Sequence, residues 1–555
     1  MRDSKRRPKS AGRCVAIVSR SHPAHGASGV LLNDGWILSH GSLLAPYLRV
    51  REARRDRDVD DELGDFFDNE VAADGSIARL PDHLQDYLRF AVHVRSSEGD
   101  VREDEASCKL ESAWRCPLLR ESFGGDLLFS WNFAKSSSGS GSIRSMLSLF
   151  LLLRMDSDEQ RDSVVGSDAA LSRFYWENFE PGVPALPCRG DPLEIESTPF
   201  GNPTFLGSVS RGILSNAVGE CDCLLVTDAM AVPGSEGAPV YALQSKKKRR
   251  LCGMVIAPLS WCRGEWVDFT FAANLRACLA VHASVELGAS SSSSLLLARE
   301  NKWASSSALL PEMLDRSLVV VKCGPNWGTG VVLDVPSGTI ITCSHVVREA
   351  SGGRVKIARV GETEDSDDAS WSIDGDDGGG LTAKVIYRTR DGQPYDLAVL
   401  KLEPAQLDLK ALRMARGLTK KGASVLAAGY PFFGSELSAS CSLGTVSRSE
   451  PAILQTTCCV QSGSSGGPVL ACGGGSLAPP EIVGIVVSNA VTASGDPSAR
   501  RLYPRFNMAV PVEAFREPLR RYIETEDVRH LEELSTNDPG AKETWSLYLT
   551  PRSKI

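Results

Sequence analysis

The chain has 555 residues, of which 42% are hydrophobic and 23% are charged, as in soluble globular proteins. This length is too great for one hydrophobic core, and 50 glycines with 30 prolines indicate the many turns of an all-β fold. A net charge of −8 provides no field that attracts nucleic acid, so a nucleic-acid partner is not expected.

The first residues are not expected to direct secretion or membrane insertion. Residues 1–13 are basic, but the apolar run that follows, 14–18, is too short for the core of a signal peptide. The arginines leave a mitochondrial presequence open, although Asp3 and the strand-like segments soon after it favour a folded domain. The longest apolar run, 146–153, is far shorter than the roughly 20 residues that cross a bilayer, so no membrane partner is expected.

The 15 cysteines lack the paired CxxC spacing of metal sites. Their closest spacings are Cys221-x-Cys223 and Cys458-Cys459. We expect buried thiols in a reducing compartment, with no metal and no cofactor. The basic run 246–250 is read as a solvated loop rather than as a nucleic-acid signal.

The two halves of the chain resemble each other. Two glycines and a proline of the first half have counterparts in the second at offsets of 232, 232 and 231, by subtraction of residue numbers: Gly190 with Gly422, Pro199 with Pro431, and Gly253 with Gly484. The segment 233–239 also parallels 462–468. This pattern predicts an internal duplication, and the serine-rich run 290–294 between the copies predicts a flexible linker.

Three short segments of the second half combine the residues that acyl transfer needs. Thr342-Cys-Ser-His345 and Tyr395-Asp396-Leu-Ala-Val each adjoin a predicted strand, and Gly463-Ser-Ser465-Gly-Gly-Pro forms a turn of small residues. A serine nucleophile needs a base, a group that orients the base, and donors for the developing oxyanion. We therefore predict His345, Asp396 and Ser465 as a catalytic triad, with the N–H groups of Gly463 and Ser465 as the oxyanion hole.

The end of the chain carries a further signal. Residues 512–533 have apolar side chains at helical spacing, which predicts a helical segment. The last three residues, Ser553, Lys554 and Ile555, are a close variant of the Ser-Lys-Leu tripeptide that is read as a peroxisomal address. The sequence therefore predicts a peroxisomal targeting signal at these residues.

The three blocks resemble the catalytic blocks of the trypsin-like superfamily, in particular of its HtrA/Deg-like branch, over residues 312–515. Phe506-Asn-Met-Ala-Val-Pro511 resembles the closing strand of that branch. With the tail and the duplicated first half, the whole chain is similar to the peroxisomal leader-peptide-processing proteases, which are trypsin-domain enzymes of the peroxisome matrix. The resemblance implies an all-β fold of two tandem trypsin-like double β-barrel units, the first degenerate, with a short helical segment at the end.

This resemblance implies the following division and function. The expected parts are a degenerate trypsin-like domain, a serine-rich linker, a catalytic trypsin-like domain and a helical segment with the targeting tripeptide: 1–287, 288–310, 311–515 and 516–555. The implied activity is that of a serine endopeptidase of the peroxisomal matrix, which removes type 2 leader peptides and processes enzymes of fatty-acid β-oxidation. The implied partners are protein substrates and the peroxisomal import receptor, and a homo-oligomer is left open.

The first half lacks a nucleophile at the matching turn. Glu236 stands where Ser465 stands, so this copy is not expected to form an acyl-enzyme. Trp36-Ile-Leu-Ser-His40 resembles the histidine block, and Asp168 is a weak candidate for the aspartate block. A structural or substrate-docking role is expected for this half.

Two matters stay open at this point. Cys458-Cys459 lies where the superfamily builds its primary specificity pocket, and without an aspartate there a small or uncharged residue before the cleaved bond is expected. The alternatives in function are a quality-control protease that degrades unfolded proteins and a non-catalytic scaffold built on protease folds.

Overall fold

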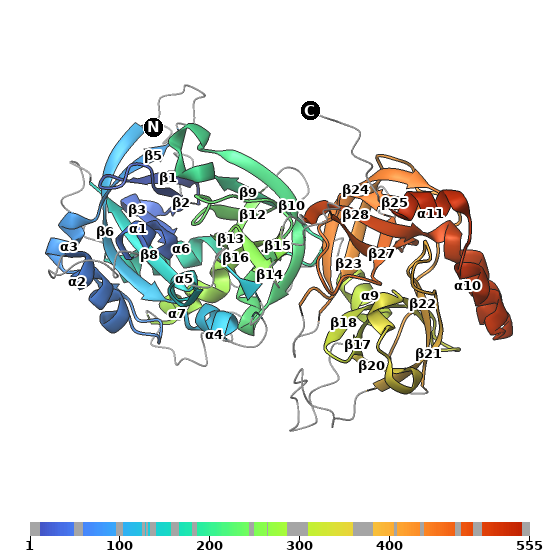
Figure 1. The fold of residues 1–555 in the computed structure, drawn as a ribbon. Coiled ribbons are helices and arrows are strands. Elements are labelled where there is room, and N and C mark those ends of the chain that lie inside the picture. The colour runs from blue at the N-terminus through green and yellow to red at the C-terminus, as the bar shows by residue number, and fades with distance from the viewer. Residues whose placement is uncertain are drawn as a thin grey trace, which may run out of the picture. The chain divides into compact units, whose positions relative to one another are not determined.

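The structure, a computed structural model, describes most of the chain, and Figure 1 shows its fold. The described residues are 12–48, 59–95, 104–124, 128, 131–133, 140–156, 166–179, 186–243, 249–262, 265–285, 309–358, 381–403, 408–432, 438–471, 479–491 and 502–546. The chain forms two compact units, the first from Met1–Gly264 with Phe269–Ser305 and the second from Glu265–Asp268 with Ser306–Ile555. The predicted linker lies almost entirely outside the described residues, as do Lys246, Lys247 and Lys248 of the basic run 246–250, whereas Arg249 and Arg250 of that run begin a strand. The assignment of the first domain as degenerate and of the second as catalytic stays a prediction.

The first unit begins with a six-stranded antiparallel barrel. Its strands follow the order β1–β2–β3–β8–β6–β5, closed by the pairing of β1 with β5, and the short β4 extends β6. A closed barrel leaves no strand edge unpaired, so even short strands are stable. The bounds are Cys14–Ser19 (β1), Gly26–Leu31 (β2), Trp36–His40 (β3), Ala78–Arg79 (β4), Arg89–Val94 (β5), Asp104–Arg115 (β6) and Leu149–Met155 (β8).

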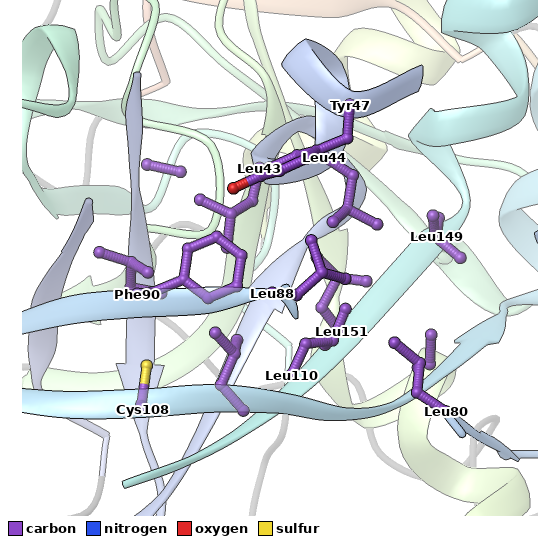
Figure 2. Packing of buried hydrophobic residues seen from close by; sticks show 14 of the residues in the cluster. Leu43, Leu44, Tyr47, Leu80, Leu88, Phe90, Cys108, Leu110, Leu149 and Leu151 are labelled. Atoms are coloured by element: carbon purple, nitrogen blue, oxygen red, sulfur yellow. The ribbon is translucent and has the colours of Figure 1, made fainter. Parts of the chain in front are cut away.

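Leucines and aromatic side chains fill this barrel. Figure 2 shows Leu110 of β6, Leu151 of β8 and Phe90 of β5 in one cluster with Leu43 and Tyr47. Leu43, Leu110 and Leu151 are fully buried, so their removal from water supplies a large hydrophobic term. The alternation of side chains along each strand places Phe90, Leu110 and Leu151 inside the barrel.

A second closed barrel completes the first unit, in the order β10–β11–β16–β13–β12–β9. Its strands are Pro192–Ser197 (β9), Ser208–Val218 (β10), Leu224–Thr227 (β11), Pro239–Leu243 (β12), Arg249–Ala257 (β13) and Thr270–Asn274 (β16). The small strands Trp131–Asn132 (β7) and Ser260–Cys262 (β14) pair with each other. The α-helices are Ala45–Leu48 (α1), Val59–Asp65 (α2), Asp82–Tyr87 (α3), Pro117–Gly124 (α4), Ser140–Leu147 (α5), Ser167–Asn178 (α6) and Leu275–Val285 (α7).

The short helical turns of the first unit connect these elements. The 3-10 turns are Asn33–Gly35 (η1), Gly41–Leu44 (η2), Pro199–Gly201 (η6), Pro203–Phe205 (η7) and Glu220–Asp222 (η8), and Phe66–Glu70 (η3) is a π-helical turn. The turn η2 follows β3 directly, and η6 follows β9.

The second unit repeats this arrangement. Its barrels follow the orders β17–β18–β19–β22–β21–β20 and β23–β24–β25–β28–β27–β26, which match the first unit strand for strand. The first barrel has Leu318–Cys323 (β17), Asn326–Asp334 (β18), Thr339–Thr342 (β19), Arg354–Ala358 (β20), Leu381–Arg388 (β21) and Ala398–Leu402 (β22). The second has Ser424–Gly429 (β23), Ser440–Glu450 (β24), Ile453–Thr456 (β25), Pro468–Ala471 (β26), Ile482–Val491 (β27) and Leu502–Pro511 (β28). The predicted all-β fold of tandem double barrels is confirmed.

The predicted helical segment at the end is confirmed as well. Helix α10 (Val512–Thr525) packs against β27 and β28, and it buries Val512, Phe515, Leu519 and Tyr522 along one face. The 3-10 turn Val528–Leu534 (η12) and helix α11 (Pro539–Ser546) follow, in red in Figure 1. Before the barrels come the short strand Glu265–Val267 (β15) and helix α9 (Leu309–Ser317), and between β19 and β20 lie the turns His345–Val347 (η9) and Ser351–Gly353 (η10). No described helix is long and apolar enough to span a membrane.

Candidate active site

His345 and Asp396 come from adjacent strands of the first barrel in the second unit. His345 opens η9 three residues after β19, and Asp396 lies two residues before β22. Because β19 pairs with β22 through Thr342 and Ala398, the two side chains lie at the same end of the barrel. The apolar, β-branched residues of β19 anchor this end in the core, since Ile340 and Ile341 are fully buried.

Two hydrogen bonds join these residues. The backbone N–H of His345 donates to Oδ1 of Asp396 at 2.9 Å, and Nδ1 of His345 lies 2.5 Å from Oδ2. Burial by itself raises the pKa of Asp396, but the hydrogen bonds and charge of His345 and the backbone of Ser344 outweigh it and hold that pKa below its usual 3.8. Asp396 is therefore ionised at neutral pH and fixes both the position and the tautomer of the imidazole.

Ser465 lies on a turn between β25 and β26 that requires glycine. Gly463 has φ of +93° and Gly466 has φ of +86°, a region that other residues rarely adopt. A Cβ on Gly463 would lie 2.2 Å from the carbonyl oxygen of Tyr430, and one on Gly466 would lie 2.1 Å from that of Thr329. Glycine at these two positions therefore lets the turn approach β18 of the first barrel and the chain just after β23 of the second barrel closely.

Thr329, in β18, ties this turn to the first barrel. Its N–H donates to the carbonyl of Ser465 at 2.8 Å, and its Oγ1 donates to the carbonyl of Gly463 at 2.7 Å. Oγ1 also accepts from the N–H of Tyr430 at 3.1 Å, and Thr342 donates to the Thr329 carbonyl at 2.7 Å. The histidine strand and the serine turn are thus held together through one buried residue.

The hydroxyl of Ser465 donates to the carbonyl of Val487 in β27, at 3.0 Å. Within the described residues, no hydrogen bond joins Ser465 to His345, so the resting hydroxyl faces β27. The N–H groups of Gly463 and Ser465 donate to no acceptor in the part of the chain that is described, whereas those of Ser464 and Gly466 bond to Gln461 and Val486. The two predicted oxyanion donors are therefore available to a ligand.

The same cluster is also the one place, among the described residues, where donor atoms of three potential metal ligands lie within 4.8 Å of one another: Cys343, His345 and Asp396. Burial raises the pKa of the Cys343 thiol, which disfavours the thiolate that metals bind. The thiol donates to the carbonyl of Val486 at 3.2 Å, and the other two residues bond to each other. The arrangement fits proton transfer better than metal binding.

The first unit repeats the serine turn with Glu236 in place of Ser465. The N–H of Ser28 donates to the carbonyl of Glu236 at 2.9 Å, as that of Thr329 does to Ser465. Oγ of Ser28 donates to the carbonyl of Gly234 at 3.1 Å and accepts from Thr198 at 3.0 Å, as Thr329 does with Gly463 and Tyr430. The predicted match of Glu236 with Ser465 is therefore confirmed.

The Glu236 side chain turns back into its own loop. Its Oε2 accepts from the N–H of Gly234 at 2.7 Å, which is the counterpart of the free donor on Gly463. Burial is the main cause that raises the pKa of Glu236, against the opposing hydrogen bonds of the loop. The carboxyl group thus takes the place that an oxyanion would take.

The predicted histidine match is wrong. Ser39 donates to the carbonyl of Ser28 at 2.8 Å as Thr342 does to Thr329, so His40 corresponds to Cys343 and Ser42 to His345. Nδ1 of His40 accepts from the N–H of Ser42 at 3.2 Å, and burial lowers the pKa of His40 to about 4. This histidine is a neutral core residue that caps a helical turn.

The weak aspartate match is wrong as well. Asp168 lies in the first turn of α6, not beside a barrel strand. In the register of β3 with β8, Ser39 faces Leu151, as Thr342 faces Ala398 in the second unit. The counterpart of Asp396 is therefore Leu149. The first unit thus has no histidine, aspartate or serine at the three positions that match His345, Asp396 and Ser465.

Glu236→Gln will raise the melting temperature of the first unit at pH 7 by about 2–4 °C. A carboxyl group whose pKa is raised on folding contributes its full stabilisation to the folded state when the pH is below its usual pKa of 4.5. That contribution is lost as the pH rises through the raised pKa of the folded state. Glutamine keeps an acceptor for Gly234 without the charge. Calorimetry at pH 7 and pH 4 checks this, with Glu220→Gln, on an exposed side chain, as the control. An equal rise in melting temperature at pH 7 and at pH 4 would contradict the raised pKa assigned to Glu236.

Two further residues of the site carry no catalytic motif in the sequence. Thr329 and Val487 lie inside ordinary strands, and Val487 acts through its backbone. Thr329 did leave a signal, because Ser28-Gly-Val-Leu-Leu and Thr329-Gly-Val-Val-Leu match across the two halves. The predicted targeting residues Ser553, Lys554 and Ile555 lie outside the described residues.

Comparisons with known proteins agree with this arrangement. The family described as trypsin-like peptidase domain matches residues 328–478. The peroxisomal leader peptide-processing protease of Mus musculus is 30% identical over 597 residues, which cover 98% of this chain and 97% of that protein. The protein of the same name from Homo sapiens is 31% identical over 394 residues, 66% of this chain and 62% of its own length.

A solved structure, HtrA-type protease AlgW with tripeptide, aligns at 20% identity over 40% of this chain and 65% of that one, with a TM-score of 0.28 that is too low to support any inference. The 30% identity to the mouse protein extends over nearly the whole of both chains, and it is sufficient by itself to assign the family. The chain belongs to the family of peroxisomal leader peptide-processing proteases, and it is a serine endopeptidase with a trypsin-like peptidase domain.

Proposed function

We propose that Ser465 is the nucleophile, that His345 takes and returns its proton, and that Asp396 holds His345. The observation that carries this proposal is the pair of hydrogen bonds from His345 to Asp396, at 2.5 and 2.9 Å, beside a turn anchored on the same barrel. The N–H groups of Gly463 and Ser465 stabilise the oxyanion of the tetrahedral intermediate. For catalysis the Ser465 hydroxyl leaves the carbonyl of Val487 and bonds to His345.

The substrate of this site is the leader peptide of proteins imported into the peroxisome. The name shared by the two relatives supports this assignment, and the tail Ser553-Lys554-Ile555 supports a location in the peroxisomal matrix, reached through the import receptor. Cleavage of type 2 leaders and processing of matrix enzymes of fatty-acid β-oxidation follow as the proposed activities. The first domain, 1–287, has a structural or docking role and no hydrolytic role of its own.

The purified chain will cut a peroxisomal thiolase precursor once, near its N-terminus, and the Ser465→Ala variant will leave it intact. Mass spectrometry of the products locates the cut. The matched control is Ser464→Ala, because Ser464 is adjacent to the nucleophile but its side chain lies within hydrogen-bond reach of the Gln461 N–H inside the turn. This control retains the cut.

Other outcomes separate the rival functions. Many cuts in unfolded casein, with an intact leader, would replace leader processing by quality control. No cut in any protein, together with no labelling of Ser465 by a fluorophosphonate probe, would leave only a scaffold built on the protease fold.

A further inference from the structure

The end of the chain reaches both barrels of the second unit. Helix α11 lies against β25 of the second barrel, and the turn η12 before it lies against β21 of the first (Figure 1). Ser535, directly after η12, shares a hydrogen bond of 2.5 Å with the hydroxyl of Tyr387 in β21. Leu531 and Leu534 of η12 are fully buried, so this segment is packed into the unit.

Trp545, near the end of α11, contacts the residue that precedes Asp396. Its ring meets the ring of Tyr395 edge-on, with the centroids 6.4 Å apart and the planes at 87°. Its Nε1–H donates to the carbonyl of Ala452, in the turn between β24 and β25, at 2.7 Å. An edge-to-face aromatic pair attracts beyond the area that it buries. The indole is therefore fixed on one barrel and holds a residue of the other.

The other end of α11 also acts on Tyr395. The Tyr395 side chain is buried, which is the main cause that raises its pKa, and the charge of Asp538 raises that pKa further. Asp538 is fixed in turn, because its Oδ2 accepts from the N–H of Ala541 in the first turn of α11 at 2.7 Å. Both ends of the helix thus adjoin Tyr395.

The backbone around Asp396 is held by different means on its two sides. Asp396 lies before β22, so it has no place in the strand ladder. After it, the carbonyl of Leu397 accepts from the N–H of Thr389 at 2.9 Å, and the N–H of Leu397 donates to Oγ1 of Thr389 at 3.1 Å. Before it, the backbone of Tyr395 makes no hydrogen bond within the described residues. The Tyr395 side chain is therefore what fixes the chain on this side.

A small displacement of Asp396 would have a large effect on catalysis. Its carboxylate meets His345 through two hydrogen bonds, of 2.5 and 2.9 Å, and such bonds weaken steeply when their angle departs from the optimum. A misplacement of about 1 Å in an active site costs up to about 10²-fold in rate. The contact that fixes Tyr395 therefore bears on the reaction rate.

We propose that Trp545 is a positioning residue of the protease, which acts through Tyr395 to fix the backbone from which Asp396 holds His345. The match to the trypsin-like peptidase domain ends at residue 478, so it does not include Trp545. This inference deepens the proposed function and rests on Asp396 as the partner of His345. It makes the helix at the end of the chain a part of the catalytic apparatus.

The test uses the full-length protein and measures the maximal rate at which a fluorophosphonate probe labels Ser465, together with kcat and KM for the thiolase precursor. Trp545→Ala is expected to lower the labelling rate and kcat by about tenfold, with KM changed by less than about twofold. Trp545→Phe retains an aromatic edge against Tyr395 and is expected to keep kcat within about threefold. The matched control is Lys542→Ala, on an exposed side chain of α11, which leaves both rates unchanged.

A double substitution separates positioning from a general loss of stability. In the Asp396→Asn background, Trp545→Ala is expected to lower the labelling rate by less than about twofold more, because the carboxylate that Trp545 positions is already absent. A full tenfold loss in that background, or an unchanged kcat in Trp545→Ala alone, overturns the role of Trp545 and leaves the protease intact.

Thermal melting shows whether each variant folds. If Trp545→Ala does not fold, Tyr395→Leu removes the same contact from the other side, with the same tenfold loss of kcat expected. If neither variant folds, the aromatic pair serves folding and not positioning, and the inference fails. An unmutated protein that the probe does not label would instead remove the proposed function itself.

Discussion

Ser465→Ala will lower kcat/KM for peptide cleavage by about 10⁶-fold and leave folding unchanged. The loss is large because no other hydroxyl can take the position of the Ser465 hydroxyl. The φ angles of Gly463 and Gly466, +93° and +86°, fix the conformation of the turn. The Ser465 hydroxyl makes one hydrogen bond, to Val487, so its removal leaves little buried polarity unsatisfied. Steady-state hydrolysis of a peptide substrate measures the effect, and circular dichroism checks the fold.

The control for this prediction is Ser464→Ala, which is expected to change kcat/KM by less than about tenfold. Ser464 keeps its backbone bond to Gln461 in this variant, so the turn retains its shape. Equal losses in the two variants would show that the turn, and not the Ser465 hydroxyl, is what the first substitution disturbs.

Asp396→Asn will lower kcat by about 10⁴-fold with a small change in KM. The carboxamide of this variant has one acceptor oxygen where the carboxylate has two. If that oxygen continues to accept from the backbone N–H of His345, as Oδ1 does at 2.9 Å, an NH₂ group replaces Oδ2 opposite Nδ1 and favours the wrong tautomer of the imidazole. Crystallography or thermal melting shows whether the backbone is retained.

The pH dependence of stability provides a second measurement for Asp396. Because the folded pKa of Asp396 lies below 3.8, its contribution to stability is present above that value and is lost as pH falls through the lowered pKa. The unmutated protein is therefore expected to lose more stability than Asp396→Asn between pH 5 and about pH 2. Parallel acid-unfolding curves for the two proteins would contradict the ionised state assigned to Asp396.

Much of the fold follows from local patterns in the sequence. Thr339-Ile-Ile-Thr and the run around Val399 are short, apolar and β-branched, so they form strands wherever a barrel lets them pair. The amphipathic spacing of residues 512–525 similarly predicts helix α10, and burial of one face against the barrel stabilises it. The repeated order of short strands predicts tandem barrels once the duplication is seen.

The candidate triad could be read from sequence because each member has a local motif with a mechanical reason. The glycines at 463 and 466 are required by positive φ angles, and the Gly-x-Ser-Gly-Gly-Pro frame to which they belong distinguishes Ser465 from Ser464. The same reasoning failed for the first unit, where His40 ends the matching strand. His40 lies two positions before the place that corresponds to His345, and sequence similarity cannot distinguish an imidazole that caps a helical turn from one that orients toward an aspartate.

The sequence by itself therefore determined the architecture and the glycine turn that carries Ser465, the proposed nucleophile, since these depend on local periodicity and on backbone angles that few residues adopt. Only the tertiary structure decided which residues meet across the barrels. The bond from Thr329 to Gly463 spans 134 positions. Such pairings are set by strand register and barrel closure, which bring together residues with no shared local pattern.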